Sequence, residues 1–241
     1  MEREAGPIVH RLARALSTQL IARDLLDRGL ADVGHAVAAD EQTTGRGRHG
    51  RSWLSPTGGL YVTFIVPHDG LIALRAGLAT ARAVEALSIP VRLKWPNDLI
   101  VAERKLGGIL IETARDVALV GVGINLEESP IDGATSLRDE GVRGDRDAFV
   151  RAIYSELARP QTEDVVLAAY RERCATLGRT VSVDRGQGRV MLGRAVDVDP
   201  FGHLVVETVD GRVTVASGDC VHLREVWPTS QGTVSHLRPF A

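Results

Sequence analysis

Three arginines alternate with glycines in one short segment of the chain. Arg46, Arg48 and Arg51 lie in the sequence GRGRHGRSW, which runs from Gly45 to Trp53. A guanidinium group binds phosphate or carboxylate through a planar fork of N–H donors. Glycine loses more backbone freedom on ordering than other residues, so the empty loop should be mobile. The segment therefore predicts a loop that closes over a negatively charged ligand.

Two further segments place cations and a carboxylate beside glycines. KWPND, from Lys94 to Asp98, puts a lysine, an amide and a carboxylate at a turn, and KLGGILIE begins at Lys105. Any residue with a side chain in place of Gly107 or Gly108 would block a flat ligand that lies against this apolar strand. Together with the arginine loop, these residues predict a site that joins a carboxylic acid to a nucleotide phosphate.

Other kinds of site fit the sequence less well. The glycine–arginine loop does not end in GKS or GKT, so it is not a Walker loop. With a formal net charge of −2, the chain would bind nucleic acid only weakly through three arginines. Cys174 and Cys220 show no CxxC spacing, which favours two buried free thiols in a reducing compartment. We therefore expect no nucleic-acid partner and no cysteine metal site.

The composition is that of an ordinary globular protein. The 241 residues are 44% hydrophobic and 25% charged, which is enough for one sizeable domain and a small one. The N-terminal segment lacks the apolar region of a signal peptide. No stretch reaches the about 18 apolar residues of a membrane span. These features predict a soluble, cytoplasmic protein with no membrane contact.

Hydrophobic patterning predicts an α/β (α+β) domain with a mixed sheet over residues 1–177. One helix should follow a cap at Ser17 or Thr18 and end at Gly29, and another should follow a cap at Asp147. Residues 127–146 have the composition of a loop. The remaining predicted helices cover 71–87 and 163–174, and the predicted strands cover 34–40, 59–66, 91–95, 106–113 and 117–126.

The pattern changes near Gly178 to short alternating strands that are separated by tight turns. No helix lies between them, which predicts a small SH3-like β-barrel over residues 178–226. Residues 227–241 are rich in Pro, Ser, Thr and Gly and should form a flexible tail. The predicted strands cover residues 180–184, 189–199, 203–209, 212–217 and 220–225.

Four motifs, GRGRHGRSW, KWPNDL, KLGGILIE and GVGIN, occur in the order and spacing of the biotin protein ligase family, which the chain resembles. The resemblance is strong over residues 16–126 and covers the barrel in outline. It implies that biotin and ATP, with Mg²⁺, form biotinyl-5′-AMP and pyrophosphate. The biotinyl group then passes to a lysine of a biotin carboxyl carrier protein domain of a biotin-dependent carboxylase.

The resemblance also implies which residues contact biotin. Lys105 would contact both the biotin carboxyl group and the phosphate, and Ile109 and Leu110 would line the apolar tail. A helix cap is the alternative role for Ser17 and Thr18. The other residues implied on the biotin side are Ser17, Thr18, Gln42, Gly45, Arg46, Gly107 and Gly108.

On the nucleotide side the resemblance implies Arg48, Trp53, Asn97, Lys105 and Asn125. Arg48 would contact the phosphate, Trp53 would stack on adenine, and Asn125 would read the adenine edge. Asn97 would bind phosphate or brace its turn. Core packing is the alternative for Trp53, and a bond within a turn is the alternative for Asn125.

The catalytic residues that the resemblance implies are Lys105, Arg48 and Asp98. Asp98 would hold Mg²⁺ or accept a proton from the incoming lysine amine. Arg51 would anchor the loop or stay solvated. Every small-molecule motif ends by residue 126, so the barrel should serve closure over ATP or docking of the carrier.

Two alternative functions stay open. A lipoate or octanoate protein ligase shares the architecture and the acyl-adenylate chemistry, although KWPND with KLGGIL favours biotin. An inactive regulatory homologue is disfavoured because Arg48, Lys105 and Asp98 are all present. Only 16 residues precede Ser17, too few for the helix-turn-helix domain of family members that repress transcription. The sequence leaves the carrier's identity and a homodimer open.

Overall fold

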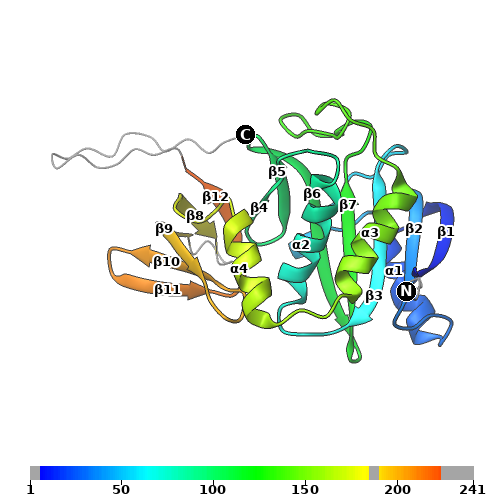
Figure 1. Ribbon diagram of the computed structural model, residues 1–241, viewed down its shortest axis with the longest axis horizontal. Helices are drawn as coiled ribbons and strands as arrows, with labels where there is room; N and C mark the ends of the chain where they lie inside the picture. Colours follow the sequence, from blue (N-terminus) through cyan, green and yellow to red (C-terminus); the bar gives the residue numbers. More distant parts are fainter. Residues whose placement is uncertain (1–5, 185–189, 224–241) are drawn as a thin grey trace.

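The computed structural model describes residues 6–184 and 190–223 (Figure 1). The predicted tail at 227–241, the last residues of the predicted barrel and the turn at 185–188 lie outside the described residues. The helices are α1 (Thr18–Asp27), α2 (Ile72–Glu85), α3 (Arg146–Ala158) and α4 (Glu163–Arg173), with a 3₁₀ turn at Arg48–Gly50. The strands are β1 (Ile8–Ala15), β2 (His35–Gln42), β3 (Leu60–Pro67), β4 (Arg92–Lys94), β5 (Asp98–Val101), β6 (Arg104–Ala114), β7 (Val117–Ile124), β8 (Thr180–Asp184), β9 (Val190–Val198), β10 (Leu204–Thr208), β11 (Gly211–Val215) and β12 (Asp219–His222).

A seven-stranded mixed sheet forms the larger part of the molecule, which confirms the predicted class. Its order is β1-β2-β3-β7-β6-β5-β4, with β1 and β2 parallel and the other neighbours antiparallel. Strands β1 and β5 were not expected from the sequence pattern. Strand β1 is an edge strand whose sequence, IVHRLARA, is rich in arginine, and Ile8 is 60% exposed. Strand β5 has only four residues, so neither strand gives a clear alternating pattern.

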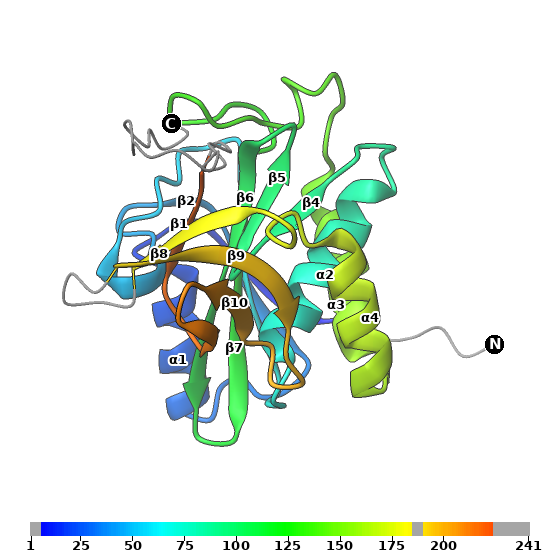
Figure 2. The same cartoon turned by 90° about the vertical axis from the view of Figure 1, so that its left-hand side faces the viewer.

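Each face of the sheet packs against helices (Figure 2). On one face α1 covers a cluster that includes Ala22, Val37 and Leu119. On the other face α2, α3 and α4 cover a larger core that includes Phe64 and Val120. Strand residues alternate between the two faces, so central strands such as β3 are buried on both sides and read as continuous apolar runs.

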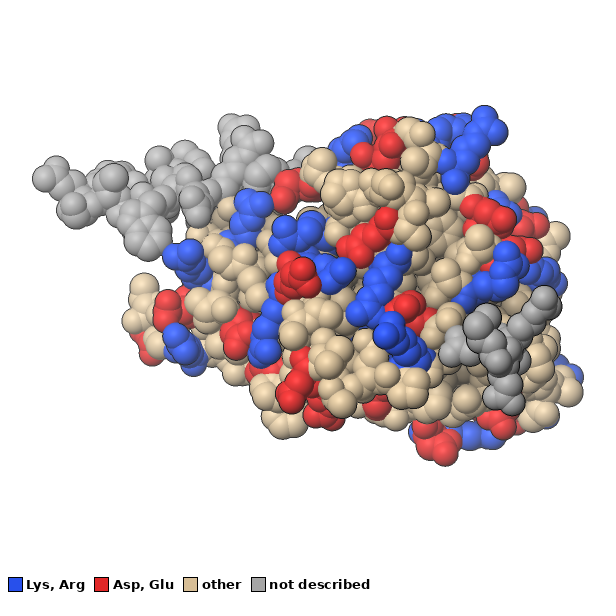
Figure 3. All heavy atoms as spheres, in the orientation of Figure 1, with Lys and Arg blue, Asp and Glu red and all other residues tan. Residues whose placement is uncertain are grey.

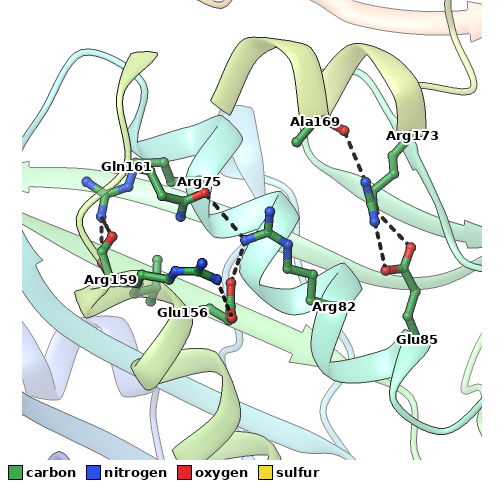
Figure 4. A network of polar contacts seen from close by, with 9 residues as sticks. Arg75, Arg82, Glu85, Glu156, Arg159, Gln161, Ala169 and Arg173 are labelled. Carbon is green, nitrogen blue, oxygen red and sulfur yellow. Dashed lines mark hydrogen bonds and ion pairs between the residues drawn. The ribbon is translucent and has the colours of Figure 1, made fainter. Parts of the chain in front are cut away.

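Ion pairs join the three helices of the larger layer (Figure 4). The guanidinium group of Arg82 on α2 pairs with Glu156 on α3, and Arg173 on α4 pairs with Glu85 on α2 at 3.0 Å. Acidic and basic side chains are interspersed over this face of the molecule (Figure 3). The described part of this surface therefore presents mixed charge to solvent.

Helix α3 begins two residues earlier than predicted, because Asp145 and not Asp147 is its N-cap. A carboxylate oxygen of Asp145 accepts hydrogen bonds from the backbone N–H groups of Asp147 at 2.8 Å and Ala148 at 3.2 Å. Asp147 is therefore already in the first turn, where a negative charge suits the helix dipole. Ser17 occupies the cap position of α1, as predicted, but its side chain makes no capping hydrogen bond.

The five C-terminal strands form a second, antiparallel sheet with the order β11-β10-β9-β8-β12. This confirms the predicted all-β C-terminal unit. The chain between the two sheets pairs with the outer strand of the larger one, where the N–H of Ala175 donates to the carbonyl of Leu93 at 2.8 Å. Among the described residues, none of the helices combines the length and apolarity needed to cross a membrane.

A buried histidine connects the C-terminal sheet to the KWPND turn. The backbone N–H of Trp95 donates to the Thr176 hydroxyl at 3.0 Å, and that hydroxyl lies 3.0 Å from Nε2 of His222. Since the Thr176 oxygen accepts from Trp95, its own proton is free to donate to His222. Burial, and then the positive charge of Lys94, lower the pKa of His222 to about 4. The histidine is therefore neutral at pH 7.

We expect His222 to make stability depend on pH below neutrality. Between about pH 6.5 and pH 4 the unfolded chain binds a proton at this position that the folded chain excludes. The free energy of unfolding should therefore fall as the pH falls, by up to about 1.4 kcal/mol per pH unit from this group. Urea unfolding at pH 7, 6 and 5 measures the slope, which His222→Gln should reduce. Equal slopes in the variant and the wild type would contradict the assignment.

Candidate active site

A cavity of about 310 Å³ lies beside the N-terminus of α1, between the glycine–arginine loop, the KWPND turn and β12. Its lining brings together most of the residues singled out in the sequence, although they come from distant parts of the chain. These are Ser17, Thr18, Gln42, Arg46, Arg48, Trp53, Asn97, Asp98, Lys105 and Gly108, together with Ile109 and Leu110. Gly45, Gly107 and Asn125 do not line it.

Glycines form the floor of this cavity. Gly108 on β6 lies directly opposite Gly123 on β7, and Leu110 lies opposite Gly121, so all four share one face of the sheet. A Cβ at Gly123 would lie 2.6 Å from the indole nitrogen of Trp53. The missing side chains therefore leave room for the Trp53 ring to approach the sheet.

Trp53 has an unusual polar environment. Its indole N–H is buried and has no hydrogen-bond partner among the described residues. The Nζ atom of Lys105 lies 5.3 Å from the ring centroid, which is a cation–π distance. A buried donor without a partner costs about 1–3 kcal/mol. The indole nitrogen packs against Gly123, so close packing on the glycine floor accounts for its missing partner.

A network of neutral polar side chains lies at the α1 end of the cavity. The Oε1 atom of Gln42 accepts from the backbone N–H of Thr18 at 2.8 Å, and its Nε2 donates to Ser55 at 2.8 Å. Thr63 donates to Thr18 at 2.9 Å or to Gln19 at 3.0 Å. These bonds fix the rotamers of side chains that face the cavity, so this end can present donors and acceptors to an uncharged polar group.

The other end of the cavity is charged. The Nζ atom of Lys105 pairs with Asp98 at 2.7 Å, and Arg48 donates to the Oδ1 atom of Asn97 at 3.3 Å. Asn97 also donates to the carbonyl of Ile109 at 2.9 Å, so it braces the turn against β6. Burial lowers the pKa of Arg48, while the nearby Asp98 carboxylate raises it. Two cations and one carboxylate therefore meet where an anion would enter.

Each of the three arginines of the glycine–arginine loop makes a polar contact with the rest of the molecule. Arg46 lies 3.8 Å from Glu112 on β6, Arg48 contacts Asn97, and Arg51 pairs with Asp219 on β12. Arg51 is thus the loop anchor that was one of its two expected roles. The loop closes on itself through the N–H of Trp53, which donates to the carbonyl of Gly45 at 2.9 Å.

The three predicted residues outside the cavity have structural roles. A Cβ at Gly45 would lie 2.3 Å from the Trp53 carbonyl oxygen, and one at Gly107 would lie 2.6 Å from the Gly123 carbonyl oxygen. Close backbone approach therefore accounts for both glycines. Asn125 is buried and donates to the Thr135 carbonyl at 3.0 Å, which is the turn-bonding alternative noted for it.

The cavity also contains residues that no sequence motif assigned to a site. Gln19 and Thr63 complete the polar network. Lys94, which was expected at the KWPND turn without a role of its own, lies directly opposite Asp98 in the β4–β5 hairpin. The C-terminal sheet contributes Asp219, Cys220 and Val221, for which the sequence carried no motif.

Carboxylates for a metal ion are few in the described part of the chain. Asp98 and Asp219 line the cavity, and each already pairs with a cation. No group of three or more His, Cys, Asp or Glu side chains converges as a metal site in residues 6–184 and 190–223. The donors therefore fit an Mg²⁺ ion that arrives with phosphates better than a resident one.

Comparison with known proteins agrees with this geometry. Residues 13–127 match the biotin/lipoate A/B protein ligase family, and residues 176–223 match the biotin protein ligase C-terminal domain. A biotin--[acetyl-CoA-carboxylase] ligase of Mycobacterium tuberculosis is 37% identical over 229 residues, covering 83% of this chain and 85% of that protein. The chain belongs to the biotin protein ligase family.

Other members of the biotin protein ligase family give the same result. The bifunctional ligase/repressor BirA of Escherichia coli is 34% identical, and the match covers 83% of this chain and 70% of that protein. The biotin protein ligase of Aquifex aeolicus, solved in complex with biotin and ATP, superposes with a TM-score of 0.78 at 30% identity. That alignment covers 90% of this chain and 99% of the Aquifex protein.

Proposed function

We propose that the chain activates biotin with ATP and transfers it to a lysine of a biotin carboxyl carrier protein domain. One observation carries the proposal: a single cavity has a neutral polar end, a glycine floor and a charged end with Lys105 and Arg48. This sequence of environments suits a ureido head group, an apolar chain and a carboxyl group facing a phosphate. The match to the biotin protein ligase C-terminal domain supports biotin over lipoate.

We assign the neutral polar end to the biotin head group. Ser17, Thr18 and Gln42 line this end, and the bonds from Gln42 to Thr18 and Ser55 hold two of these side chains in place. The apolar tail of biotin would then run over Gly108 and Leu110. Arg46 would face the carboxyl end after leaving Glu112, which holds it only at 3.8 Å.

In the first step a carboxylate oxygen of biotin attacks the α-phosphorus of ATP, and the bond from that phosphorus to the bridging oxygen breaks. Pyrophosphate leaves with the electron pair. We assign Lys105 and Arg48 to the charge that builds on the α-phosphate oxygens, because fixed cations in a partly buried site stabilise such charge strongly. Asp98 orients Lys105 through the 2.7 Å pair.

In the second step the lysine amine of the carrier attacks the carbonyl carbon of biotinyl-5′-AMP. The bond from that carbon to the phosphate oxygen breaks and AMP leaves. The amine nitrogen must lose a proton, and we assign its acceptance to Asp98, the carboxylate that lies beside Lys105. Trp53 lines the cavity and would stack on adenine.

Mg²⁺ would supply charge neutralisation on the phosphates of ATP. The phosphates would provide its ligands, because Asp98 already pairs with Lys105 and is assigned to the proton transfer. We further propose a domain division near residue 177, since α4 ends at Arg173 and β8 begins at Thr180. The name of the Mycobacterium tuberculosis relative, a biotin--[acetyl-CoA-carboxylase] ligase, supports a carrier domain of such a carboxylase as the acceptor.

The acid specificity tests the proposal. ATP–pyrophosphate exchange should be supported by biotin with Mg·ATP and not by lipoate or octanoate, because the neutral polar end offers hydrogen bonds that only biotin's ureido group uses. Chelation of Mg²⁺ should stop the exchange. Side-by-side assays with the three acids provide the measurement. Lipoate-dependent exchange that exceeds biotin-dependent exchange would overturn the assignment.

A further inference from the structure

The turn between β11 and β12 touches the glycine–arginine loop at two points. The side chain of Arg51 pairs with Asp219, and an Nη1 donor of Arg48 contacts the carbonyl oxygen of Gly218 at 3.3 Å. These partners are 168 and 170 residues apart in the sequence. Asp219 and its neighbours Cys220 and Val221 also line the cavity. The C-terminal sheet therefore forms one wall of the site.

Charge explains why a carboxylate is needed at this position. Burial lowers the pKa of Arg48, the Asp98 carboxylate raises it, and the nearby charge of Arg51 lowers it further. Asp98 thus offsets the charge of Arg48, and Arg51 needs a carboxylate of its own. Two like charges on one short loop push it open unless a counter-charge is near. Asp219 supplies that counter-charge to Arg51, and it does so from the domain opposite the loop.

The β11–β12 turn is itself fixed in place. A Cβ at Gly218 would lie 2.8 Å from the carbonyl oxygen of Asp184 and 2.9 Å from a methyl carbon of Val183. The turn thus packs directly on β8, and β12 continues from it as the antiparallel neighbour of β8, with Asp219 opposite Asp184. A turn that is fixed in this way can hold the glycine–arginine loop in one position.

We propose that Asp219 is a positioning residue for the first step: it holds the loop through Arg51, so that Arg48 faces the α-phosphate of ATP. The inference rests on the proposed function and extends it, because it gives the C-terminal sheet a role in nucleotide use. Arg48 touches the nucleotide, whereas Asp219 acts only through the loop. The biotin head group binds at the opposite end of the cavity and does not depend on this contact.

The test is Asp219→Asn, with exposed Asp210→Asn in the β10–β11 turn as the matched control. Asp219→Asn should raise KM for ATP in pyrophosphate exchange about two- to fivefold, the range for a partly exposed ion pair. The dissociation constant for biotin and the melting temperature should stay unchanged. Asp219→Glu keeps the carboxylate, so its KM for ATP should be close to that of the wild type. Added salt should reduce the difference in KM between Asp219→Asn and the wild type.

A double-mutant cycle tests whether Asp219 acts through its ion pair with Arg51 or through the general stability of the fold. Arg51→Gln should raise KM for ATP as Asp219→Asn does, and the double variant should be no worse than either single variant. Additive effects, or an unchanged KM for ATP in Asp219→Asn, would overturn the proposal. Biotin-dependent exchange by the wild type tests the proposed function separately. The role of Asp219 is measured as the ratio of KM for ATP in the variant to that in the wild type.

Discussion

Replacing Lys105 with methionine should lower the rate of biotin-dependent ATP–pyrophosphate exchange by about 100-fold or more. Methionine keeps the length of the side chain, so the change removes mainly the ammonium group. Lys105 supplies a cation at the charged end of the cavity, 2.7 Å from Asp98. Its loss removes charge stabilisation and leaves the half-buried Asp98 carboxylate without its partner, next to incoming phosphates.

Arg104→Met is the control for this prediction, since Arg104 is the preceding residue on β6 and its guanidinium group pairs with Glu140 outside the cavity. Exchange in that variant should stay within about twofold of wild type, as for other surface positions. Rates are measured as incorporation of labelled pyrophosphate into ATP at saturating biotin. A Lys105→Met enzyme with near wild-type exchange would exclude Lys105 from the chemistry.

Replacing Arg48 with alanine should raise the dissociation rate of biotinyl-5′-AMP by about 10- to 100-fold. This range corresponds to the loss of one hydrogen bond to a charged group. Biotin affinity should change far less, because the partner charge exists only once phosphate is present. Arg48 donates to Asn97 and to the Gly218 carbonyl, each at 3.3 Å. These contacts hold its guanidinium group at the charged end of the cavity.

The measurement for Arg48 is the dissociation rate of biotinyl-5′-AMP from the isolated complex, with biotin affinity determined by calorimetry. Arg151→Ala, an exposed arginine on α3 outside the cavity, serves as the control. If Arg48→Ala weakened biotin and adenylate binding equally, the guanidinium group would belong to the biotin end, and the assignment of the two ends would be wrong.

Much of the fold was predictable because local hydrophobic patterns indicate most of its helices and strands. Central strands such as β3 read as apolar runs, and the short alternating strands after Gly178 predicted the second sheet. Strand β1 was not predictable, since it pairs on one side only and exposes arginines. The cap of α3 was misplaced by two residues because Asp145 and Asp147 are equally good caps in sequence, and only the backbone geometry decides between them.

Site residues that lie in sequence motifs were predictable. Site residues that only tertiary contacts bring to the cavity were not. Arg48, Asp98 and Lys105 lie in motifs, and the structure brings them to one cavity. Gly107 belongs to a motif as well, but it does not line the cavity. A side chain at this position would clash with the backbone of Gly123, which accounts for the glycine. Asp219 has no motif, because its partner Arg51 lies 168 residues away, and no local pattern encodes so distant a contact.

The contact between the loop and β12 has a consequence for synthesis on the ribosome. The glycine–arginine loop and the floor of the cavity emerge early, but their opposite wall is the last strand of the described chain. A nascent chain therefore lacks the Asp219 partner of Arg51 until 168 further residues have been added. Closing such a distant contact is slow compared with local structure. The chain should thus gain full affinity for nucleotide only after translation has passed β12.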